Sequence, residues 1–328
     1  MKKYFLFILI SIFFLPDLAQ QNDTEKNSSN LCYAIGINCH IPKPQDLDLI
    51  KDARIGFIRV DLTWDVVEPK RGQYKWDMVD RLVNEAQSRG IRILAILGYS
   101  PLWASSNGDI HDPPASTKEW QGFVTKIVSR YKGKIEYFSL WNEPNSKTFF
   151  KGDINEFIGK VFIPGAEALK KANPDAKIVG PDLAHLKGAK WDEWLEKILV
   201  RCSDDIDVLS HHCYKSKPKK LKRNLQGFMP PWDPPAVRRI LEKTGCLNKP
   251  FWLTEFGFRS NKIGYEKQAD YIEKFIKYHQ KMGWVEKIFI YELRDSPIEP
   301  GFGIVENDRT PKEAYTRIKE IIKDCNKN

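Results

Sequence analysis

From residue 32 onward, short apolar runs alternate with longer segments in which apolar residues recur at helical spacing. The runs are rich in Val, Ile, Leu and Phe and alternate little with polar residues, as expected of parallel strands buried on both faces. The predicted strands are Tyr33–Asn38, Ile55–Val60, Ile91–Leu97, Ile135–Leu140, Lys177–Val179, Ile206–Ser210, Pro250–Thr254 and Trp284–Tyr291. The predicted helices are Gln45–Ala53, Trp76–Arg89, Ser116–Tyr131, Ile154–Lys171, Trp191–Val200, Pro235–Lys243, Gly264–Gln280 and Pro311–Lys323.

Strands that alternate with helices in this order predict an α/β fold, a single (β/α)8 TIM barrel over residues 32–328. An open doubly wound sheet is the alternative. It is disfavoured because no Gly-rich nucleotide loop follows the first strand. We see no linker that would divide the barrel, so we expect one domain.

The first residues predict a secretory signal peptide, residues 1–19, followed by a polar linker, residues 20–31. Lys2 and Lys3 precede an apolar stretch from Tyr4 to Leu15, which is short for a membrane span of about 20 residues. We therefore expect a secreted or periplasmic protein with no membrane contact beyond the signal segment. An uncleaved N-terminal anchor is the alternative, because Asp17 occupies a position that usually holds a small residue.

Export permits disulfides among the six cysteines, although the sequence alone does not fix their pairing. In the predicted barrel, the plausible pairs are Cys202 with Cys246 and Cys32 with Cys325. Cys39 and Cys213 would then be free thiols at strand ends. No Cys or His spacing resembles a metal site, and we expect neither a metal nor another cofactor.

The formal net charge of +9 is typical of a solvated surface and also favours anionic partners such as acidic polysaccharides. No basic motif with interleaved aromatic residues predicts nucleic-acid binding, and we expect a monomer. The basic run Lys215–Arg223 follows the sixth strand. Such a run is usually a solvated loop, and the sharper hypothesis is that it flanks a cleft and favours a negatively charged glycan.

In a barrel of this kind, functional side chains lie where the strands end. Two glutamates occupy such positions, one in Trp141-Asn142-Glu143-Pro144-Asn145 and one in Trp252-Leu253-Thr254-Glu255-Phe256-Gly257. Glycosidic bond cleavage requires such a pair: one carboxyl donates a proton to the leaving oxygen, and the other attacks or activates water. The sequence therefore predicts an enzyme that acts on a carbohydrate.

Further strand-end residues extend this pattern. They are Arg59, Asn142-Glu143, His212-Cys213-Tyr214, Glu255, the segment with Trp64, Glu68-Pro69, Gly72, Tyr74 and Trp76-Asp77, and the stretch Gly98 to Trp103. With these residues the chain resembles the retaining glycoside hydrolases of clan A, and it is similar to family 39 and related, family 5-like barrel enzymes. The resemblance covers residues 33–325.

The resemblance implies that Glu143 is the general acid/base and Glu255 the nucleophile of a double displacement on an oligo- or polysaccharide. Glu143 should be the less solvated carboxyl, with a raised pKa that keeps it protonated near neutral pH. The two carboxyls of a retaining enzyme should lie about 5–5.5 Å apart. The plainer reading of each glutamate is a structural ion-pair partner, but their joint occurrence with Asn142 and Tyr214 favours catalysis.

The resemblance also implies supporting roles. Asn142 would hydrogen-bond the sugar 2-hydroxyl, and Arg59 would keep Glu255 ionised unless it merely fills the barrel mouth. Tyr214 would donate to Glu255, and His212 would orient the acid/base or the substrate. Tyr291 stands where many clan members place a Trp under the cleaved sugar.

Three aromatic residues, Trp103, Tyr99 and Trp64, could be sugar platforms or could serve loop packing. Two other functions stay open beside hydrolysis. One is a catalytically inactive carbohydrate-binding barrel, and the other is transglycosylation.

Overall fold

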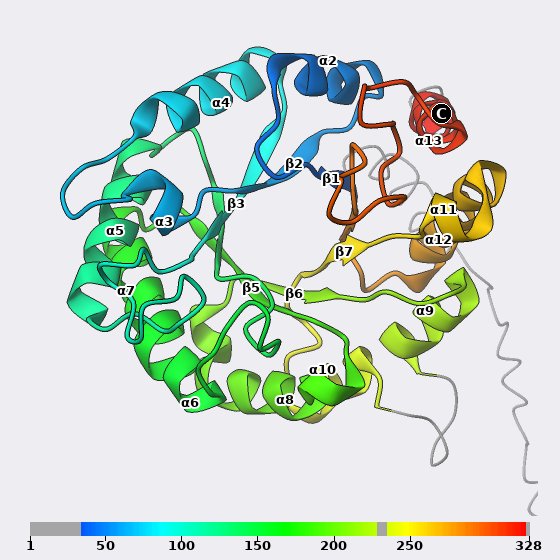
Figure 1. The fold of residues 1–328 in the computed structure, drawn as a ribbon. Coiled ribbons are helices and arrows are strands. Elements are labelled where there is room, and N and C mark those ends of the chain that lie inside the picture. Colours follow the sequence, from blue (N-terminus) through cyan, green and yellow to red (C-terminus); the bar gives the residue numbers. More distant parts are fainter. Residues whose placement is uncertain (1–33, 228–234, 326–328) are drawn as a thin grey trace, which may run out of the picture.

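The computed structural model describes residues 34–227 and 235–325. Parallel strands close into a barrel in sequence order, with β1 paired to both β2 and β8 (Figure 1). The strands are β1 Ile35–Asn38, β2 Phe57–Asp61, β3 Arg92–Leu97, β4 Tyr137–Leu140, β5 Lys177–Leu183, β6 Val208–His212, β7 Phe251–Phe256 and β8 Lys287–Ile290. The predicted (β/α)8 TIM barrel is confirmed.

Helices surround the barrel and cover the outer faces of the strands (Figure 1). The main helices are α2 Pro44–Asp52, α4 Trp76–Ser88, α5 Thr117–Arg130, α7 Ile163–Ala172, α8 Trp191–Cys202, α9 Pro218–Gln226, α10 Val237–Lys243, α12 Tyr265–Met282 and α13 Glu313–Cys325. Shorter turns are α3 Trp64–Val67, α6 Ile154–Glu156, the π-helix η1 Phe157–Phe162, the 3-10 turns η2 Lys187–Ala189 and η3 Ser203–Asp205, and α11 Ser260–Ile263.

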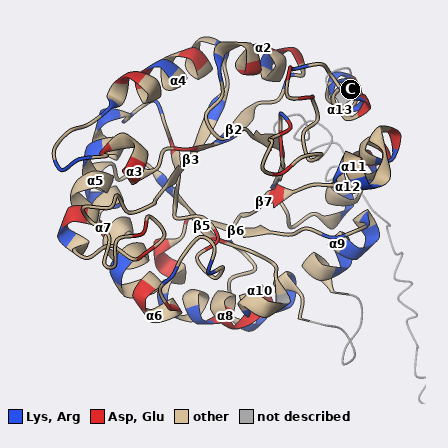
Figure 2. Ribbon diagram, viewed as in Figure 1, with Lys and Arg blue, Asp and Glu red and all other residues tan. Residues whose placement is uncertain are grey.

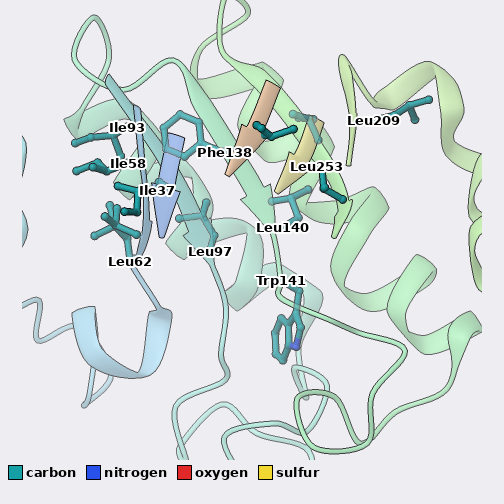
Figure 3. Close-up of a cluster of buried hydrophobic side chains, with 14 of the residues drawn as sticks. Ile37, Ile58, Leu62, Ile93, Leu97, Phe138, Leu140, Trp141, Leu209 and Leu253 are labelled. Atoms are coloured by element: carbon teal, nitrogen blue, oxygen red, sulfur yellow. The ribbon is translucent and has the colours of Figure 1, made fainter. Parts of the chain in front are cut away.

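The hydrophobic core lies mainly between the strands and this helical ring. Ile37, Ile58, Leu97 and Phe138 are buried strand residues of this core (Figure 3). The helices present matching apolar stripes, such as Val79, Leu82, Val83 and Ala86 on α4.

A second cluster, Phe57, Leu94, Val179, Val208, Trp252 and Phe289, is formed by residues from six different strands. The rings of Phe57 and Trp252 meet edge-to-face at 5.6 Å. Side chains two residues apart on a strand share a face, so Arg59 and Thr254 lie on the same faces as these two rings, further along β2 and β7. The alternation of side chains along each strand therefore places polar residues at the C-terminal mouth of the barrel.

Two of the elements that differ from the prediction are β5 and α9. The strand predicted as Lys177–Val179 continues to Leu183, because pairing with β6 resumes at Leu183 after a register shift beyond Gly180. The apolar pattern stops at Gly180-Pro181, so the sequence underestimated this strand. Most of the basic run that we expected in a loop forms helix α9, whose buried Leu221 and Leu225 pack it into the outer ring.

The predicted Cys202–Cys246 disulfide is wrong. Both thiols are free and buried: Cys202 ends α8 inside the core, and the Sγ of Cys246 points to the Thr244 carbonyl oxygen at 3.5 Å. Cys39 and Cys213 are free, as expected. The pair of Cys32 with Cys325, the signal peptide and the linker involve residues outside the described ones. Within the described ranges, no helix is long and apolar enough to cross a bilayer.

Candidate active site

A cavity of about 770 Å³ lies at the C-terminal mouth of the barrel. Strand ends that are far apart in sequence converge on it, as the predicted barrel requires. The walls include these predicted site residues: Arg59, Tyr99, Asn142, Glu143, Tyr214, Glu255 and Tyr291. His212, which does not line the cavity, is buried directly behind Glu143.

Glu143 follows β4 in a left-handed backbone conformation with φ of 45°, which is uncommon for a residue with a long side chain. Its backbone N–H donates to the carbonyl oxygen of Asp182 at 3.0 Å, which fixes the turn. Its Oε1 lies 2.8 Å from Nδ1 of His212. Burial raises the pKa of Glu143 to about 7, against the opposing charge of Arg59.

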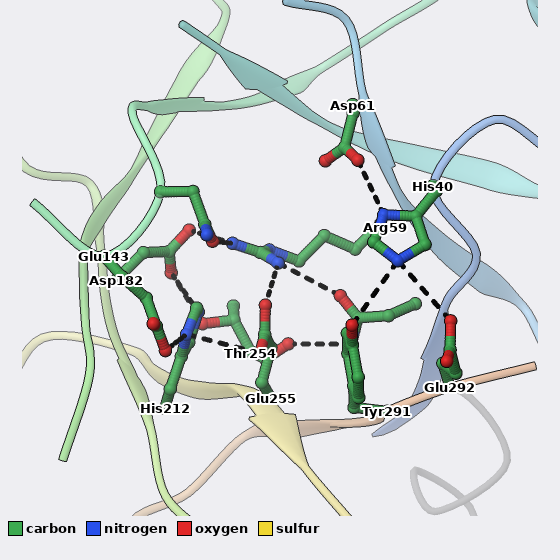
Figure 4. A network of polar contacts seen from close by, with 12 residues as sticks. His40, Arg59, Asp61, Glu143, Asp182, His212, Thr254, Glu255, Tyr291 and Glu292 are labelled. Atoms are coloured by element: carbon green, nitrogen blue, oxygen red, sulfur yellow. Dashed lines mark hydrogen bonds and ion pairs between the residues drawn. The ribbon is translucent and has the colours of Figure 1, made fainter. Parts of the chain in front are cut away.

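Glu255 lies on β7 and has two strong hydrogen-bond donors. Arg59 Nη1 donates to Oε1 at 2.6 Å, and the Tyr214 hydroxyl donates to Oε2 at 2.6 Å (Figure 4). Burial raises the pKa of Glu255, while its contacts with His212, Arg59 and Tyr214 oppose that rise. Our expectation that Glu143 is the less solvated carboxyl is wrong, because its side chain is 12% exposed and that of Glu255 is 9% exposed. The donors that surround Glu255 also cover it.

The two carboxyls are close enough to contact the two atoms of one glycosidic bond. One carboxylate oxygen of each and a ring nitrogen of His212 all lie within 4.8 Å of one another. Carboxyls of inverting glycosidases are about 6.5–9.5 Å apart, to leave room for a water, whereas those of retaining enzymes are closer. The spacing therefore fits direct attack by one carboxylate.

Three such donor atoms could in principle bind a metal ion. Here each of them already has a partner: Glu143 meets His212, and Glu255 accepts from Arg59 and Tyr214. The Arg59 guanidinium also supplies the positive charge that an ion would bring. The absence of a metal at this cluster stays a prediction.

Arg59 joins the strands at the mouth of the barrel. Besides Glu255, its guanidinium donates to Asn38 Oδ1 at 3.1 Å, Asn142 Oδ1 at 2.8 Å and Asp182 Oδ2 at 2.9 Å. Burial works against the charge of Arg59, but Asp182 and Glu255 outweigh it and raise its pKa above the usual range. The guanidinium is thus a permanent cation beside Glu255.

Asp182 and Asn38 were not among the predicted site residues. Asp182 is fully buried on β5 and accepts from Arg59 and, at 2.6 Å, from the Thr254 hydroxyl. Asn38 ends β1 and donates to the Thr254 carbonyl oxygen at 3.0 Å. Both are polar residues at strand ends, and that position was the available signal.

Two of the predicted aromatic platforms do not reach the cavity. Trp64 is fully buried, stacks on Phe123 at 5.6 Å and donates to Glu68 Oε2 at 2.7 Å. Trp103 packs edge-to-face on Trp64 at 5.4 Å and donates to the Glu68 carbonyl oxygen at 3.0 Å. Both are packing residues under the rim, and only Tyr99 of the three lines the cavity.

A polar wall of the cavity surrounds Tyr291. Its hydroxyl donates to Glu299 Oε2 at 2.7 Å, and Glu299 belongs to the loop after β8. His40 lies between Asp61 at 2.7 Å and Glu292 at 3.4 Å, whose hydrogen bonds raise its pKa to about 10 (Figure 4). Sequence reasoning missed the role of Glu299 because no strand pattern places that loop.

Residues 110–301 match the family model described as "Glycosyl hydrolase catalytic core". The chain belongs to this family. The match includes Glu143 and Glu255, while Arg59 lies before it. Family membership confirms the resemblance to glycoside hydrolases that the strand-end residues indicated.

Known glycosyl hydrolases are similar over most of the chain. A β-xylosidase of Geobacillus stearothermophilus is 23% identical over 74% of this chain and 55% of its own length. A family 39 glycoside hydrolase from Bacteroides cellulosilyticus WH2 has a TM-score of 0.71 at 23% identity, over 90% of this chain and 64% of that one. A family 39 β-xylosidase from Caulobacter crescentus has a TM-score of 0.70 at 19% identity, over 88% and 71%. The chain thus spans about half the length of that first xylosidase.

Another part of the cavity lining comes from the loops after β4 and β5. These lining residues are Thr148, Phe149, Ala184, His185 and Leu186. Leu186 is an exposed hydrophobic residue at the rim. Apolar residues also line the cavity from the loop after β8, where Ile298 and Phe302 accompany Glu299.

Proposed function

We propose that this protein is a retaining glycoside hydrolase that cleaves O-glycosidic bonds of an oligo- or polysaccharide. The observation that carries the proposal is the pair of buried glutamates with oxygens within 4.8 Å and with unlike partners. Glu143 contacts a histidine, whereas Glu255 accepts from an arginine and a tyrosine. These environments suit one proton donor and one ionised nucleophile.

In the first step, a Glu255 oxygen attacks the anomeric carbon, and the bond to the leaving oxygen breaks as Glu143 gives that oxygen its proton. The product is a glycosyl ester of Glu255. In the second step, Glu143 removes a proton from water as the water oxygen attacks the same carbon. The ester bond breaks, Glu255 regains its charge and Glu143 regains its proton.

Arg59 and Asn142 support the first step. Arg59 stabilises the Glu255 carboxylate before attack, with a charge-assisted hydrogen bond of 2.6 Å. Arg59 also donates to Oδ1 of Asn142 at 2.8 Å, so the Asn142 Nδ2 group is oriented to donate to a sugar hydroxyl. Tyr214 holds the second Glu255 oxygen in place.

The position of the acid fixes how the substrate lies. Glu143 must reach the leaving oxygen, so the leaving group occupies the end of the cavity with Phe149 and Leu186. The sugar that becomes attached to Glu255 lies toward Tyr291 and Glu299. The carboxylate and hydroxyl groups of that end suit hydrogen bonds to sugar hydroxyls.

The export, assembly and charge preference of the protein are further parts of the proposal. We infer a secreted or periplasmic protein from the N-terminal sequence alone, and that the protein is a monomer stays an expectation. The exposed lysines Lys217, Lys219 and Lys220 at the start of α9, a helix rich in basic positions, support a preference for acidic polysaccharides (Figure 2). Charge reversal at all three tests it: the rate on an acidic glycan relative to a neutral one should fall, and most at low salt. An unchanged ratio would refute the preference.

A reducing-end assay against a polysaccharide panel, with xylan included because the relatives are named xylosidases and xylanases, tests the activity. Activity should appear on at least one glycan and be nearly abolished in Glu255→Ala. Binding without turnover on every glycan would favour an inactive carbohydrate-binding barrel. Products longer than the substrate would favour transglycosylation.

A further inference from the structure

Asp182 forms hydrogen bonds with groups next to both glutamates, but its side chain forms none with Glu143 or Glu255. Its Oδ2 accepts from Arg59 at 2.9 Å, and Arg59 in turn donates to Glu255. Its backbone carbonyl accepts from the Glu143 N–H at 3.0 Å. The same residue thus fixes the cation beside Glu255 and the main chain of Glu143.

Asp182 also faces the histidine that contacts Glu143. Its Oδ1 lies 3.8 Å from Nε2 of His212, whose Nδ1 is 2.8 Å from Glu143. That Nε2 is buried and has no hydrogen-bond partner among the residues that the structure describes. A hydrogen on His212 Nε2 would therefore face the Asp182 carboxylate.

We propose that Asp182 is a positioning residue that orients Arg59 toward Glu255 and selects the His212 tautomer that accepts a hydrogen bond from protonated Glu143. This goes beyond the proposed function, which needs only the two glutamates and their immediate partners.

The tautomer follows from the charge of Asp182. Burial works to raise the pKa of Asp182, but the charge of Arg59 and hydrogen bonds with Ser210 and Thr254 outweigh it and keep the pKa below its usual value, so Asp182 stays ionised. An ionised carboxylate favours the hydrogen on the facing nitrogen, Nε2. Since burial lowers the pKa of His212, the ring is neutral and its Nδ1 is left as an acceptor. A protonated Glu143 then donates to Nδ1 and is stabilised in the acid form.

The carboxylate is held rigidly enough for this role. Thr254 donates to Oδ1 at 2.6 Å, and the Asp182 N–H donates to Ser210 Oγ at 3.0 Å. The backbone at Asp182 is left-handed, with φ of 52°, a region that Asp enters more readily than most residues. Both the chain direction and the side chain are therefore fixed by β6 and β7.

Glu143 is influenced by more charges than Asp182 alone. The titratable and charged groups that face it from the packed elements are Arg59, Tyr99, Asp182, His212, Tyr214, Glu255 and Glu299. Of these, Asp182 and Glu299 raise the pKa of Glu143 and Arg59 lowers it. Removal of the Asp182 charge should therefore lower the pKa of Glu143.

The test is Asp182→Asn, with two readouts. In the pH profile of kcat/KM on an aryl β-xyloside, or on the panel glycan that is cleaved, the high-pH limb should move down by about one pH unit. The maximal kcat/KM should fall at least about tenfold. The matched control is Asp46→Asn, which also removes a buried carboxylate from an arginine, Arg309, but lies outside the cavity. The Asp46→Asn substitution should lower the free energy of unfolding and leave the high-pH limb of the kcat/KM profile unchanged.

The second readout needs no activity. Ring 15N spectra resolve the six histidines, and His212→Gln identifies the relevant signal. Below pH 7, wild-type His212 should be the neutral Nε2–H tautomer, and Asp182→Asn should shift it toward Nδ1–H. A wild-type His212 in the Nδ1–H tautomer would overturn the proposal. So would a folded Asp182→Asn protein in which neither the His212 tautomer nor the high-pH limb of kcat/KM changes. Failure of hydrolysis in the wild type would refute the proposed function and leave this spectroscopic test intact.

Discussion

His212 Nδ1 lies 2.8 Å from Glu143 Oε1 and 3.5 Å from Glu255 Oε2, so one ring nitrogen faces both glutamates. The shorter contact assigns the hydrogen bond to Glu143. Since the ring is buried and its pKa is lowered by that burial, it adds no permanent charge to the pair. The positive charge is instead supplied by Arg59, on the side of Glu255.

The activity should depend on pH through this pair. Burial raises the pKa of Glu143 to about 7, and the acid form is the active one, so kcat/KM should fall as pH rises through about 7. The pKa of Glu255 is also raised, by burial, so activity should fall at low pH before the ordinary glutamate range is reached. Initial rates on the cleaved glycan between pH 4 and 9 measure both limbs. A profile that stays flat to pH 9 would argue against Glu143 as the acid.

Removal of the acid should matter most for poor leaving groups. Glu143→Ala should lower kcat/KM by about 10²–10⁴-fold on a glycan, but far less on a 2,4-dinitrophenyl glycoside, whose leaving group needs no proton. Added azide should restore turnover of that activated substrate with retained configuration. Glu193→Ala, an exposed glutamate on α8, is the control and should behave as wild type. Equal losses on both substrates would contradict the acid role.

The Tyr291–Glu299 contact should contribute to sugar binding. Tyr291→Phe removes the 2.7 Å hydrogen bond to Glu299, so the carboxylate loses its orientation toward the cavity. We expect KM to rise and kcat/KM to fall about tenfold, the effect of a lost hydrogen bond to a charged group. Tyr265→Phe, on the exposed start of α12, is the matched control and should leave KM unchanged. An unchanged KM in Tyr291→Phe would exclude this contact from binding.

A buried ion pair supports the loop that carries Glu299. Lys312 Nζ is 2.6 Å from Asp295 Oδ2 and 3.0 Å from the Gly303 carbonyl oxygen, with 1% of its side chain exposed. Lys312→Met would leave the Asp295 carboxylate without its cation and should lower the free energy of unfolding by about 3–5 kcal/mol, measured by denaturant unfolding. Lys190→Met, which breaks an exposed pair with Glu193, should cost less than about 1 kcal/mol. Similar losses in both variants would refute the role of the buried pair.

The sequence was most informative where strand period and polarity agree. Arg59 lies two residues after Phe57, on the same strand face, so its place in the mouth of the barrel follows from the period of a strand. Glu143 and Glu255 are predicted in the same way, from apolar runs that stop at a carboxylate. Residue type and position were both visible in these cases.

Other features could not be predicted because they depend on how loops and rings turn in space. Trp64 and Trp103 are aromatic residues near strand ends, but their indole N–H groups donate to Glu68 and neither ring lines the cavity. Glu299 reaches the cavity from a loop that has no periodic pattern. Asp182 follows a Gly-Pro pair that hid the end of β5, so its contacts with Arg59 emerged only from the closed barrel.

The stereochemistry of the first-formed product tests the proposed mechanism most directly. Proton NMR of the freshly released sugar, recorded before the anomers equilibrate, compares its configuration with that of the cleaved bond. Double displacement through Glu255 predicts the same anomeric configuration in product and substrate. A first product of inverted configuration would contradict a covalent intermediate on Glu255.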